Sequence, residues 1–548
     1  MKITGRRIKY SLAIIFILAS FSQSQAQYFG QNKIKNKRLD FSVVKSPNFE
    51  IYHYIQNDSI LRKLINDTER WYQMHQSVLK DTFNTLNPVI FYNNHADFQQ
   101  TNTIFGDIGV GTGGVTEGLK NRVVMPINES NHQTDHVLGH ELVHAFQYHL
   151  LRTGDSTSLN NIRNLPLWMV EGMAEYMSIG YLDSHTAMWM RDSYQNDDLP
   201  TLEQLTTNGK YFPYRYGQAF WAYVTGIWGD QIIEPLFTTT AKYGYEKAIP
   251  MVLGYEADVL SNMWRTNLKE FYGDFWEGID TVAAGKNILN ANNSGTMNIS
   301  PAISPNGKMV AFLSEKNIFS IDLFLANAET GKIIKKLYST SRNGHIDDLN
   351  FLESAGTWSP NSDQFAFTAF SGGKNKLIVV DANHPNKTET YDLEGLDAFS
   401  NPAWSPDAKQ IAVTGLVNGQ SDIFLFDITT QRVKQITNDK YSYLQPNWSP
   451  DGNQLIMATE RNQNGTSSRG YNILIYDLNT GNDNFIDIFE GAENLNPIFA
   501  PDGNSIYFLS NRDGFRNLYN YNLKTEELNQ LTRYFTGISG ITALRCDF

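Results

Sequence analysis

The sequence predicts a multidomain protein in which an α+β domain is followed by an all-β propeller. Three observations support this fold class. The 548 residues exceed the size of one ordinary domain. Strand-like segments and then helix-like segments fill the first half, and one motif recurs five times in the second half. We expect a leader at residues 1–26, the α+β domain at 27–285 and the propeller at 286–548.

The first 26 residues have the pattern of a secretory signal peptide. Four basic residues within the first nine precede an apolar run at 12–21, and small residues follow at 24–26. The apolar run is shorter than the roughly 20 residues that cross a bilayer. We therefore expect cleavage after Ala26, export to the periplasm or the cell exterior, and a mature chain without a transmembrane segment. An uncleaved anchor is the alternative.

Composition limits the partners and the means of stabilisation. The formal net charge is −12 and the sequence pI is about 5.4. A nucleic-acid-binding protein needs a basic surface, so we expect no nucleic-acid partner. The single cysteine, Cys546, excludes an internal disulfide.

The N-terminal elements follow from hydrophobic periodicity. NFEIYHYI (48–55) alternates like a half-buried strand, residues 58–83 resemble an amphipathic helix, and PVIFYNN (88–94) is another strand. A glycine-rich turn leads into a further strand within 113–128. Helices are then expected around 136–148, 165–181 and 214–276. The Asn-rich stretch from 285 to 296 marks the domain boundary, and we expect few contacts to cross it.

The segment HELVH contains a candidate zinc site. His140 and His144 are four residues apart, so on a helix both imidazoles point to one side. Zinc accepts neutral imidazole nitrogens, and Glu141, rotated by about 100°, would miss the metal but reach a water beside it. The alternative is a pair of hydrogen-bonded core histidines. We expect His136, one turn earlier, to be a cap or surface residue.

A third ligand is needed, because catalytic zinc keeps three protein ligands and one open position. Gln147 and Leu150 stand where the extended metzincin motif has glycine and histidine, which excludes that family. PLWMVEGMAEY follows and places Glu171 27 residues after His144. A helix that turns Glu171 toward the first helix would complete a His-His-Glu site.

This pair of motifs resembles the gluzincin peptidases, over about residues 48–276. The resemblance implies that Glu171 is the third zinc ligand and that Glu175 orients a zinc histidine, with a solvated helix face as the alternative for Glu175. It also implies a tyrosine that stabilises the oxyanion. Of Tyr214 and Tyr216 we choose Tyr216, with a packing role as the alternative. The strand near 113–128 would hold substrate by β-augmentation. It lacks the acidic-Asn pattern that captures a free amino terminus, which favours an endopeptidase.

Five segments of the C-terminal half share one frame. Each segment has a large apolar residue two positions before its last proline, and a tight turn follows that proline. These prolines are Pro305, Pro360, Pro406, Pro450 and Pro501, so the spacings are 55, 46, 44 and 51 residues. Short apolar strands such as QFAFTA and LIVVD follow each turn, which gives four strands per repeat. This period favours a β-propeller over an irregular β-sandwich.

The repeat resembles the WSPDG-type blade of TolB-like propellers, over about residues 296–536. The resemblance implies a protein-binding platform and a ring that usually has six blades. We expect five recognisable blades, with or without an incomplete sixth. A truncated chain, a five-bladed ring and closure by residues before Thr296 stay open.

Together these features predict an exported zinc metallopeptidase of gluzincin type that holds one Zn²⁺ ion and cleaves peptides or proteins. Its propeller would bind a protein partner or the substrate. The alternative is a non-catalytic envelope scaffold whose TolB-like propeller mediates protein–protein contacts.

Overall fold

The computed structural model describes residues 33, 35–104, 106, 108–152, 158–275, 279, 285–317, 320–339, 348–349 and 356–544. The predicted signal peptide, residues 1–26, lies outside the described residues. Within them, no helix combines the length and the hydropathy that crossing a membrane requires.

The N-terminal domain is built on a mixed five-stranded sheet in the order β1-β2-β3-β5-β4. Its strands are β1 (Ser42–Lys45), β2 (Phe49–His53), β3 (Asn87–Tyr92), β4 (Val115–Glu117) and β5 (Arg122–Pro126). β2, β3 and β5 are parallel, and helix α2 (Asp58–Leu79) crosses from β2 to β3. The predicted α+β class is therefore corrected to α/β, because parallel neighbours need a crossover connection and α2 supplies it.

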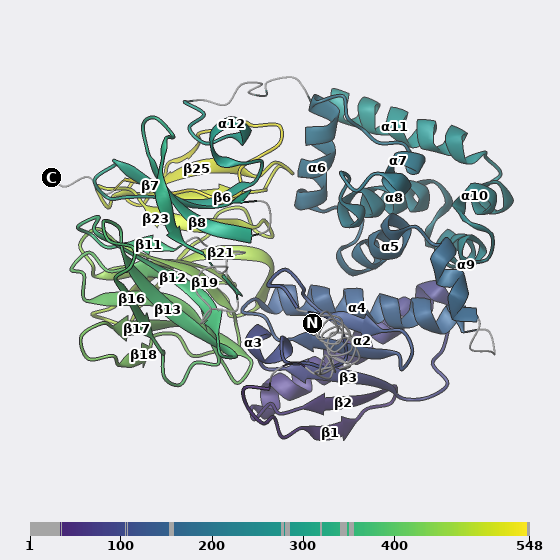
Figure 1. Cartoon of the computed structure of the whole chain (residues 1–548), viewed down its shortest axis with the longest axis horizontal. Coiled ribbons are helices and arrows are strands. Elements are labelled where there is room, and N and C mark those ends of the chain that lie inside the picture. The colour runs from purple at the N-terminus through teal and green to yellow at the C-terminus, as the bar shows by residue number, and fades with distance from the viewer. Residues whose placement is uncertain are drawn as a thin grey trace, which may run out of the picture.

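Helix α4 lies between this sheet and a layer of helices (Figure 1). The layer follows α4 (Asn131–Leu151) in the chain and comprises α5 (Leu167–Ile179), α6 (Ser184–Gln195), α7 (Leu202–Thr207), α8 (Pro213–Trp228), α9 (Ile233–Tyr243), α10 (Tyr245–Leu253) and α11 (Ala257–Gly273). Trp168, Trp221 and Trp264 are fully buried in its core. The helices predicted around 136–148, 165–181 and 214–276 are confirmed.

The C-terminal part forms five antiparallel sheets within the described residues, each one blade of a propeller. Blade one comprises β6 (Asn298–Ile303), β7 (Met309–Asn317), β8 (Ser320–Asn327) and β9 (Ile333–Tyr338); blade two β10 (Asp348–Leu349), β11 (Thr357–Trp358), β12 (Gln364–Ser371), β13 (Lys374–Asp381) and β14 (Thr388–Tyr391); blade three β15 (Ala398–Trp404), β16 (Gln410–Val417), β17 (Gln420–Asp427) and β18 (Val433–Gln435); blade four β19 (Tyr443–Trp448), β20 (Gln454–Arg461), β21 (Ser467–Asp477) and β22 (Asp483–Ile486); blade five β23 (Asn494–Phe499), β24 (Ser505–Ser510), β25 (Asn517–Asn522) and β26 (Leu528–Gln530). The five predicted blades are confirmed.

The repeated motif explains why the blades form and stack. In blade four, Ser449 Oγ donates to Asp451 Oδ1 at 2.6 Å, and Gly452 adopts a φ of +74°, which closes the turn between β19 and β20. Trp448 Nε1 donates to the Ala403 carbonyl of blade three at 2.9 Å. Trp358 Nε1 of blade two likewise donates to the Ala302 carbonyl of blade one at 2.9 Å. In these two blades the motif therefore makes a turn within its own blade and joins it to the preceding one.

The N-terminus of α4 is one of the places where the two parts of the chain meet; another is α6, where Arg191 Nη1 donates to the Gly514 carbonyl at 2.9 Å. In the first turn of α4, Asn131 N donates to Ser442 Oγ at 2.9 Å, and His132 N donates to Glu460 Oε1 at 2.8 Å. Ser130, the N-cap, accepts from Gln133 N and shares a 2.6 Å hydrogen bond with Tyr471 Oη. The boundary stretch itself carries short helix α12 (Ala291–Ser294), which packs on blade one. The contact between the domains is thus made far from the boundary stretch.

Candidate metal centre

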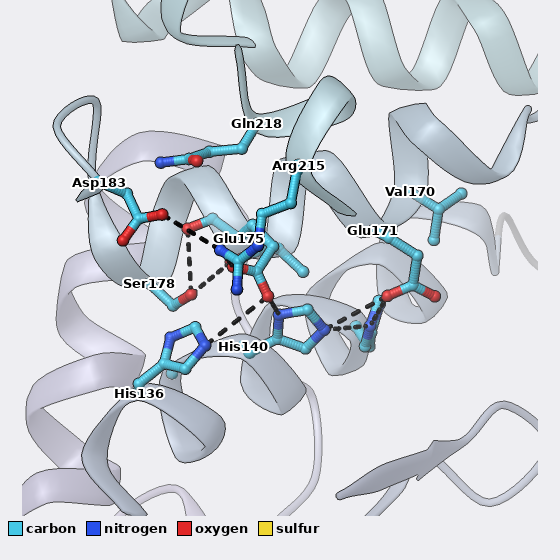
Figure 2. Close-up of polar contacts among 12 residues, drawn as sticks. His136, His140, Val170, Glu171, Glu175, Ser178, Asp183, Arg215 and Gln218 are labelled. Carbon is cyan, nitrogen blue, oxygen red and sulfur yellow. Dashed lines mark hydrogen bonds and ion pairs between the residues drawn. The ribbon is translucent and has the colours of Figure 1, made fainter. Parts of the chain in front are cut away.

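Helices α4 and α5 present interleaved histidines and glutamates to one another. His136, His140 and His144 lie one turn apart on α4, and Glu171 and Glu175 lie one turn apart on α5. Glu175 Oε1 lies 3.7 Å from His136 Nε2 and 3.4 Å from His140 Nδ1 (Figure 2). Glu171 Oε2 lies 3.3 Å from His140 Nε2 and 3.2 Å from His144 Nε2. His136 is therefore not a surface cap, because it contacts the buried carboxylate of Glu175.

Three ligand-type atoms form a nearly equilateral triangle. His140 Nε2 and His144 Nε2 are 3.1 Å apart, and each lies 3.2–3.3 Å from Glu171 Oε2. Tetrahedral zinc with ligands at about 2.0–2.1 Å places them about 3.3 Å from one another. Glu171 Oε2 is buried without a well-aligned hydrogen-bond partner. The spacing of these three atoms fits a tetrahedral ion that keeps a fourth position open. Among the described residues, His140, His144 and Glu171 are the group of three that could hold a metal ion.

The outer ring nitrogens of both histidines are held by side chains. His144 Nδ1 contacts Gln147 Oε1 at 2.8 Å, and Gln147 Nε2 donates to the Val170 carbonyl at 2.9 Å. His140 Nδ1 contacts Glu175, whose other oxygen lies 3.2 Å from Arg215 Nη1 (Figure 2). An acceptor on Nδ1 fixes the tautomer that leaves Nε2 free to bind a metal. Gln147 and Glu175 thus contact the outer ring nitrogens of His144 and His140, respectively.

The charges around the triad favour a cation. Burial alone would lower the pKa of His140, but contacts with Glu171 and Glu175 raise it to about 10. Burial would raise the pKa of Glu175, yet its contacts with His136 and His140 hold that pKa below its usual range. Carboxylates therefore surround the two imidazoles so closely that the cluster holds positive charge, as a proton or as a metal ion.

Glu141 is fixed beside the triad by the edge strand of the sheet. Its Oε2 accepts a 2.7 Å hydrogen bond from Thr116 Oγ1, on β4. Gly114, just before β4, lies against this side chain. A Cβ atom on Gly114 would lie 3.0 Å from Glu141 Oε1 and 2.8 Å from Glu141 Cγ, so only glycine fits at this position without a shift of Glu141. β4 is the outermost strand, which confirms that the glycine-rich segment leads into an edge.

Of the two candidate tyrosines, the structure brings Tyr214 to the cluster and leaves Tyr216 outside it. The Tyr214 ring stacks on His140 with centroids 5.8 Å apart. Burial, followed by the charge of Glu171, raises the pKa of Tyr214 and keeps its hydroxyl protonated. Tyr216 is buried, and its hydroxyl is hydrogen-bonded to Ser193. The choice of Tyr216 is corrected on this geometry, because residues two apart on a helix face nearly opposite sides.

A close helix crossing sets the positions of Glu171 and Tyr214. A Cβ atom on Gly172 would lie 2.2 Å from the carbonyl carbon of Gly217, and one on Gly217 would lie 1.9 Å from the Trp168 carbonyl oxygen. Helices α5 and α8 therefore touch backbone to backbone at this point. Glu171 precedes the first of these glycines and Tyr214 lies in the first turn of α8, so the crossing places both beside α4.

Four residues of the site are not among the predicted site residues: Gln147, Arg215, Tyr214 and Thr116. Gln147 has a local signal, because a residue three positions after His144 lies on the same helix face. Tyr214 has a partial signal in its position beside Tyr216. Thr116 and Arg215 reach the site from other elements, and no local pattern marks them.

Comparisons with known proteins concern the propeller and short stretches of the chain. Residues 393–542 match the family model described as TolB beta propeller domain. Dipeptidyl-peptidase 5 of Porphyromonas gingivalis is 31% identical over 124 residues, which are 21% of this chain and 16% of that protein. The uncharacterized peptidase YuxL of Bacillus subtilis is 22% identical over 175 residues, which are 32% of this chain and 24% of that protein. The chain thus spans a quarter or less of the length of these two relatives.

Solved structures resemble the chain over less than half of its length. TolB from Acinetobacter baumannii has a TM-score of 0.36 and 20% identity, and the match covers 46% of this chain and 58% of that one. A puromycin-hydrolyzing peptidase of Mycobacterium tuberculosis has a TM-score of 0.31 and 13% identity, over 43% and 38% of the two chains. The family match and the five antiparallel sheets identify the C-terminal part of the chain as a TolB-like β-propeller.

Proposed function

We propose that the protein is a zinc-dependent metallopeptidase of gluzincin type. The observation that carries this proposal is the triangle of His140 Nε2, His144 Nε2 and Glu171 Oε2, with separations of 3.1–3.3 Å. Glu141 stands beside the triangle on the same helix but contributes no ligand to it. Three ligands, an open position and an adjacent carboxylate are what metal-assisted peptide hydrolysis requires.

His140, His144 and Glu171 would hold one Zn²⁺ ion, which when bound supplies Lewis-acid activation of water and of the scissile carbonyl. Glu141 accepts the proton that water loses as it attacks the carbonyl carbon, and then donates that proton to the leaving amine nitrogen. Thr116 holds the Glu141 carboxylate in place through its 2.7 Å hydrogen bond. The Tyr214 hydroxyl donates a hydrogen bond to the oxygen on which negative charge develops.

Other parts of the chain have roles that are consistent with an exported peptidase. Substrate backbone pairs with the outer edge of β4, beside Glu141. This segment lacks the acidic-Asn pattern that captures a free amino terminus, which favours an endopeptidase. The N-terminal segment 1–26 directs export to the periplasm or the cell exterior, and the propeller binds a protein partner or substrate. Both relatives described above are named as peptidases, which supports the reaction class but not the zinc chemistry.

Two variants separate metal binding from catalysis. His144→Ala removes a ligand, so zinc content and activity on an unfolded protein substrate should fall together. Glu141→Gln keeps the ligand triangle and removes only the carboxylate that moves the proton. Zinc should stay near one ion per chain, while the rate falls by about 10²–10⁴-fold. Elemental analysis of the purified chain gives the zinc content, and release of soluble peptides from reduced, unfolded protein gives the rate.

Glu203→Gln serves as the matched control, because this glutamate is exposed on α7. It should keep both zinc and activity. Equal loss of zinc in the Glu141→Gln and His144→Ala variants would assign Glu141 a structural role. A wild-type chain that binds no zinc would leave the non-catalytic scaffold as the function.

A further inference from the structure

A row of aromatic rings leads away from the candidate metal centre. Tyr214 stacks on His140 at 5.8 Å and 14°, Phe212 stacks on Tyr214 at 5.0 Å and 25°, and Trp189 stacks on Phe212 at 5.6 Å and 30°. Trp189 is 43% exposed and Phe212 is 42% exposed. Tyr214 is half-buried. Large aromatic rings of soluble proteins are usually covered, so a row of stacked rings that starts at a candidate reaction centre and ends in two exposed rings indicates a binding surface. We call Tyr214, Phe212 and Trp189 the aromatic strip.

The strip ends at a cavity of about 790 Å³ between the helical layer and the propeller. Trp189 on α6 and Gln133 on α4 form part of its wall. Inner strands of the blades and residues 539–544 also line it. Gln133 lies seven residues before His140, which is about 10 Å along the helix axis. Two independent routes, one along α4 and one along the strip, thus connect this cavity to the triad.

The propeller wall of the cavity is polar and repetitive. Ser300, Asn401, Gln445 and Asn496 each adopt a positive φ, near 50°, and each is followed by a proline that also lines the cavity. The sheet register shifts at each of these positions, and Asn496 N donates to Gln445 Oε1 at 2.7 Å, which links two neighbouring blades at the wall. The one acid–base pair in the described wall, Glu493 with Arg516 at 2.8 Å, is mutually neutralised.

We propose that the aromatic strip and this cavity bind one extended segment of the polypeptide substrate, on one side of the bond to be cleaved. This inference rests on the proposed peptidase function and names its substrate class: unfolded or flexible chains with several residues beyond the scissile bond. The ring separations give a path of about 16 Å, which about five residues of an extended chain cover at about 3.3 Å each.

A polypeptide fits the chemistry of both parts better than other ligands. Exposed rings pack against side chains and against the flat faces of peptide groups. The exposed amide of Gln133, in a wall that is otherwise largely uncharged, suits the alternating donors and acceptors of a peptide backbone. A phosphorylated or nucleic-acid ligand would need a cluster of unpaired basic side chains, whereas Arg516 in this wall is paired with Glu493.

The test compares two unstructured peptides that share one cleavable bond, with two or with six residues on each side of it. The wild type should cleave the longer peptide with a kcat/KM at least about tenfold higher. Trp189→Ala should abolish this advantage, and so should Gln133→Trp, which fills the cavity. Both positions are exposed, so the substitutions should not prevent folding. Tyr243→Ala is the matched control, because Tyr243 is 44% exposed on α9 and should leave the advantage intact.

A second readout does not depend on turnover. In the full-length Glu141→Gln background, fluorescence anisotropy of the labelled longer peptide should give a Kd that Trp189→Ala raises about tenfold. If the Glu141→Gln chain binds the longer peptide through Trp189 but the wild type cleaves neither peptide, the binding site stands and the peptidase proposal fails. If the wild type cleaves both peptides equally and Trp189→Ala leaves the Kd unchanged, the aromatic strip is not a substrate site and the peptidase proposal stands.

Discussion

Replacement of Glu460 by alanine should loosen the helix that carries the candidate metal ligands. Glu460 belongs to blade four, is 2% exposed, and accepts hydrogen bonds from His132 N at 2.8 Å and from Ser130 Oγ at 3.2 Å. Ser130 is the N-cap of α4 and His132 lies in its first turn. The carboxylate thus stabilises free amide groups and the positive end of the helix dipole.

The size of the effect follows from these contacts. A hydrogen bond to a charged acceptor contributes about 1.5–3 kcal/mol, and loss of a helix N-cap costs about 1 kcal/mol. Ser130 keeps its own bonds to Gln133 N and Tyr471 in the variant, so we count only the bond to His132 N and the loss of charge. We expect the first turn of α4 to open more easily by about 2 kcal/mol, which corresponds to about thirty-fold faster amide exchange.

Hydrogen–deuterium exchange followed by mass spectrometry measures this directly in the peptide that contains residues 130–136. Glu460→Gln should show a smaller increase, because its amide oxygen still accepts a hydrogen bond without the charge. Glu490→Ala, at an exposed position of the same blade, should leave the exchange unchanged. Unchanged exchange in Glu460→Ala would refute the reasoning, because the remaining contacts, such as that of Asn131 N with Ser442, would then be sufficient to hold the first turn.

Three further outcomes are expected. Gly172→Ala places a Cβ atom 2.2 Å from the Gly217 backbone, so α5 must move away from α8 and displace Glu171. Zinc affinity should therefore fall at least about tenfold, as measured by competition with a chromophoric chelator. Tyr214→Phe should lower kcat by about 10²-fold through loss of an oxyanion donor, whereas Tyr216→Phe should leave kcat within about twofold. Burial lowers the pKa of His75 to about 4, so the unfolded chain takes up a proton at this residue as the pH falls below about 6.5 and the folded chain does not. Through His75 alone, lowering the pH from 7 to 5 should reduce the free energy of unfolding by about 2 kcal/mol. Urea titrations should show that the decrease is smaller by this amount in His75→Gln than in the wild type.

Features with a local period were predictable from the sequence. The spacing of His140 and His144 is one helical turn, and Glu171 lies in a second helix with its own apolar pattern. The five turn motifs repeat at blade length, so the propeller could be predicted without any knowledge of how the blades pack. In both cases the pattern lies within a short stretch of sequence, so it could be recognised without knowledge of the tertiary structure.

The choice between Tyr214 and Tyr216 depended on information that no local pattern holds. Both residues stand in the first turns of α8, and both are aromatic. Which of them faces the triad is decided by the rotation of α8 about its axis. That rotation is fixed where Gly217 meets Gly172, a contact between residues 45 positions apart in the sequence. The sheet class was missed for a similar reason, since parallel pairing is a property of strand order in space.

The sequence did not reveal how the N-terminal domain and the propeller contact one another. The polar stretch at 285–296 suggested two bodies with few contacts, and it does separate helices from blades along the chain. The contact lies elsewhere: the first-turn amides of α4 are bound by Ser442 and Glu460 of blade four, more than 300 residues later. His140 lies on the same helix, eight residues after His132. Because α4 carries both this contact with the propeller and the two histidines of the candidate site, we expect a change that loosens the contact to alter the positions of His140 and His144.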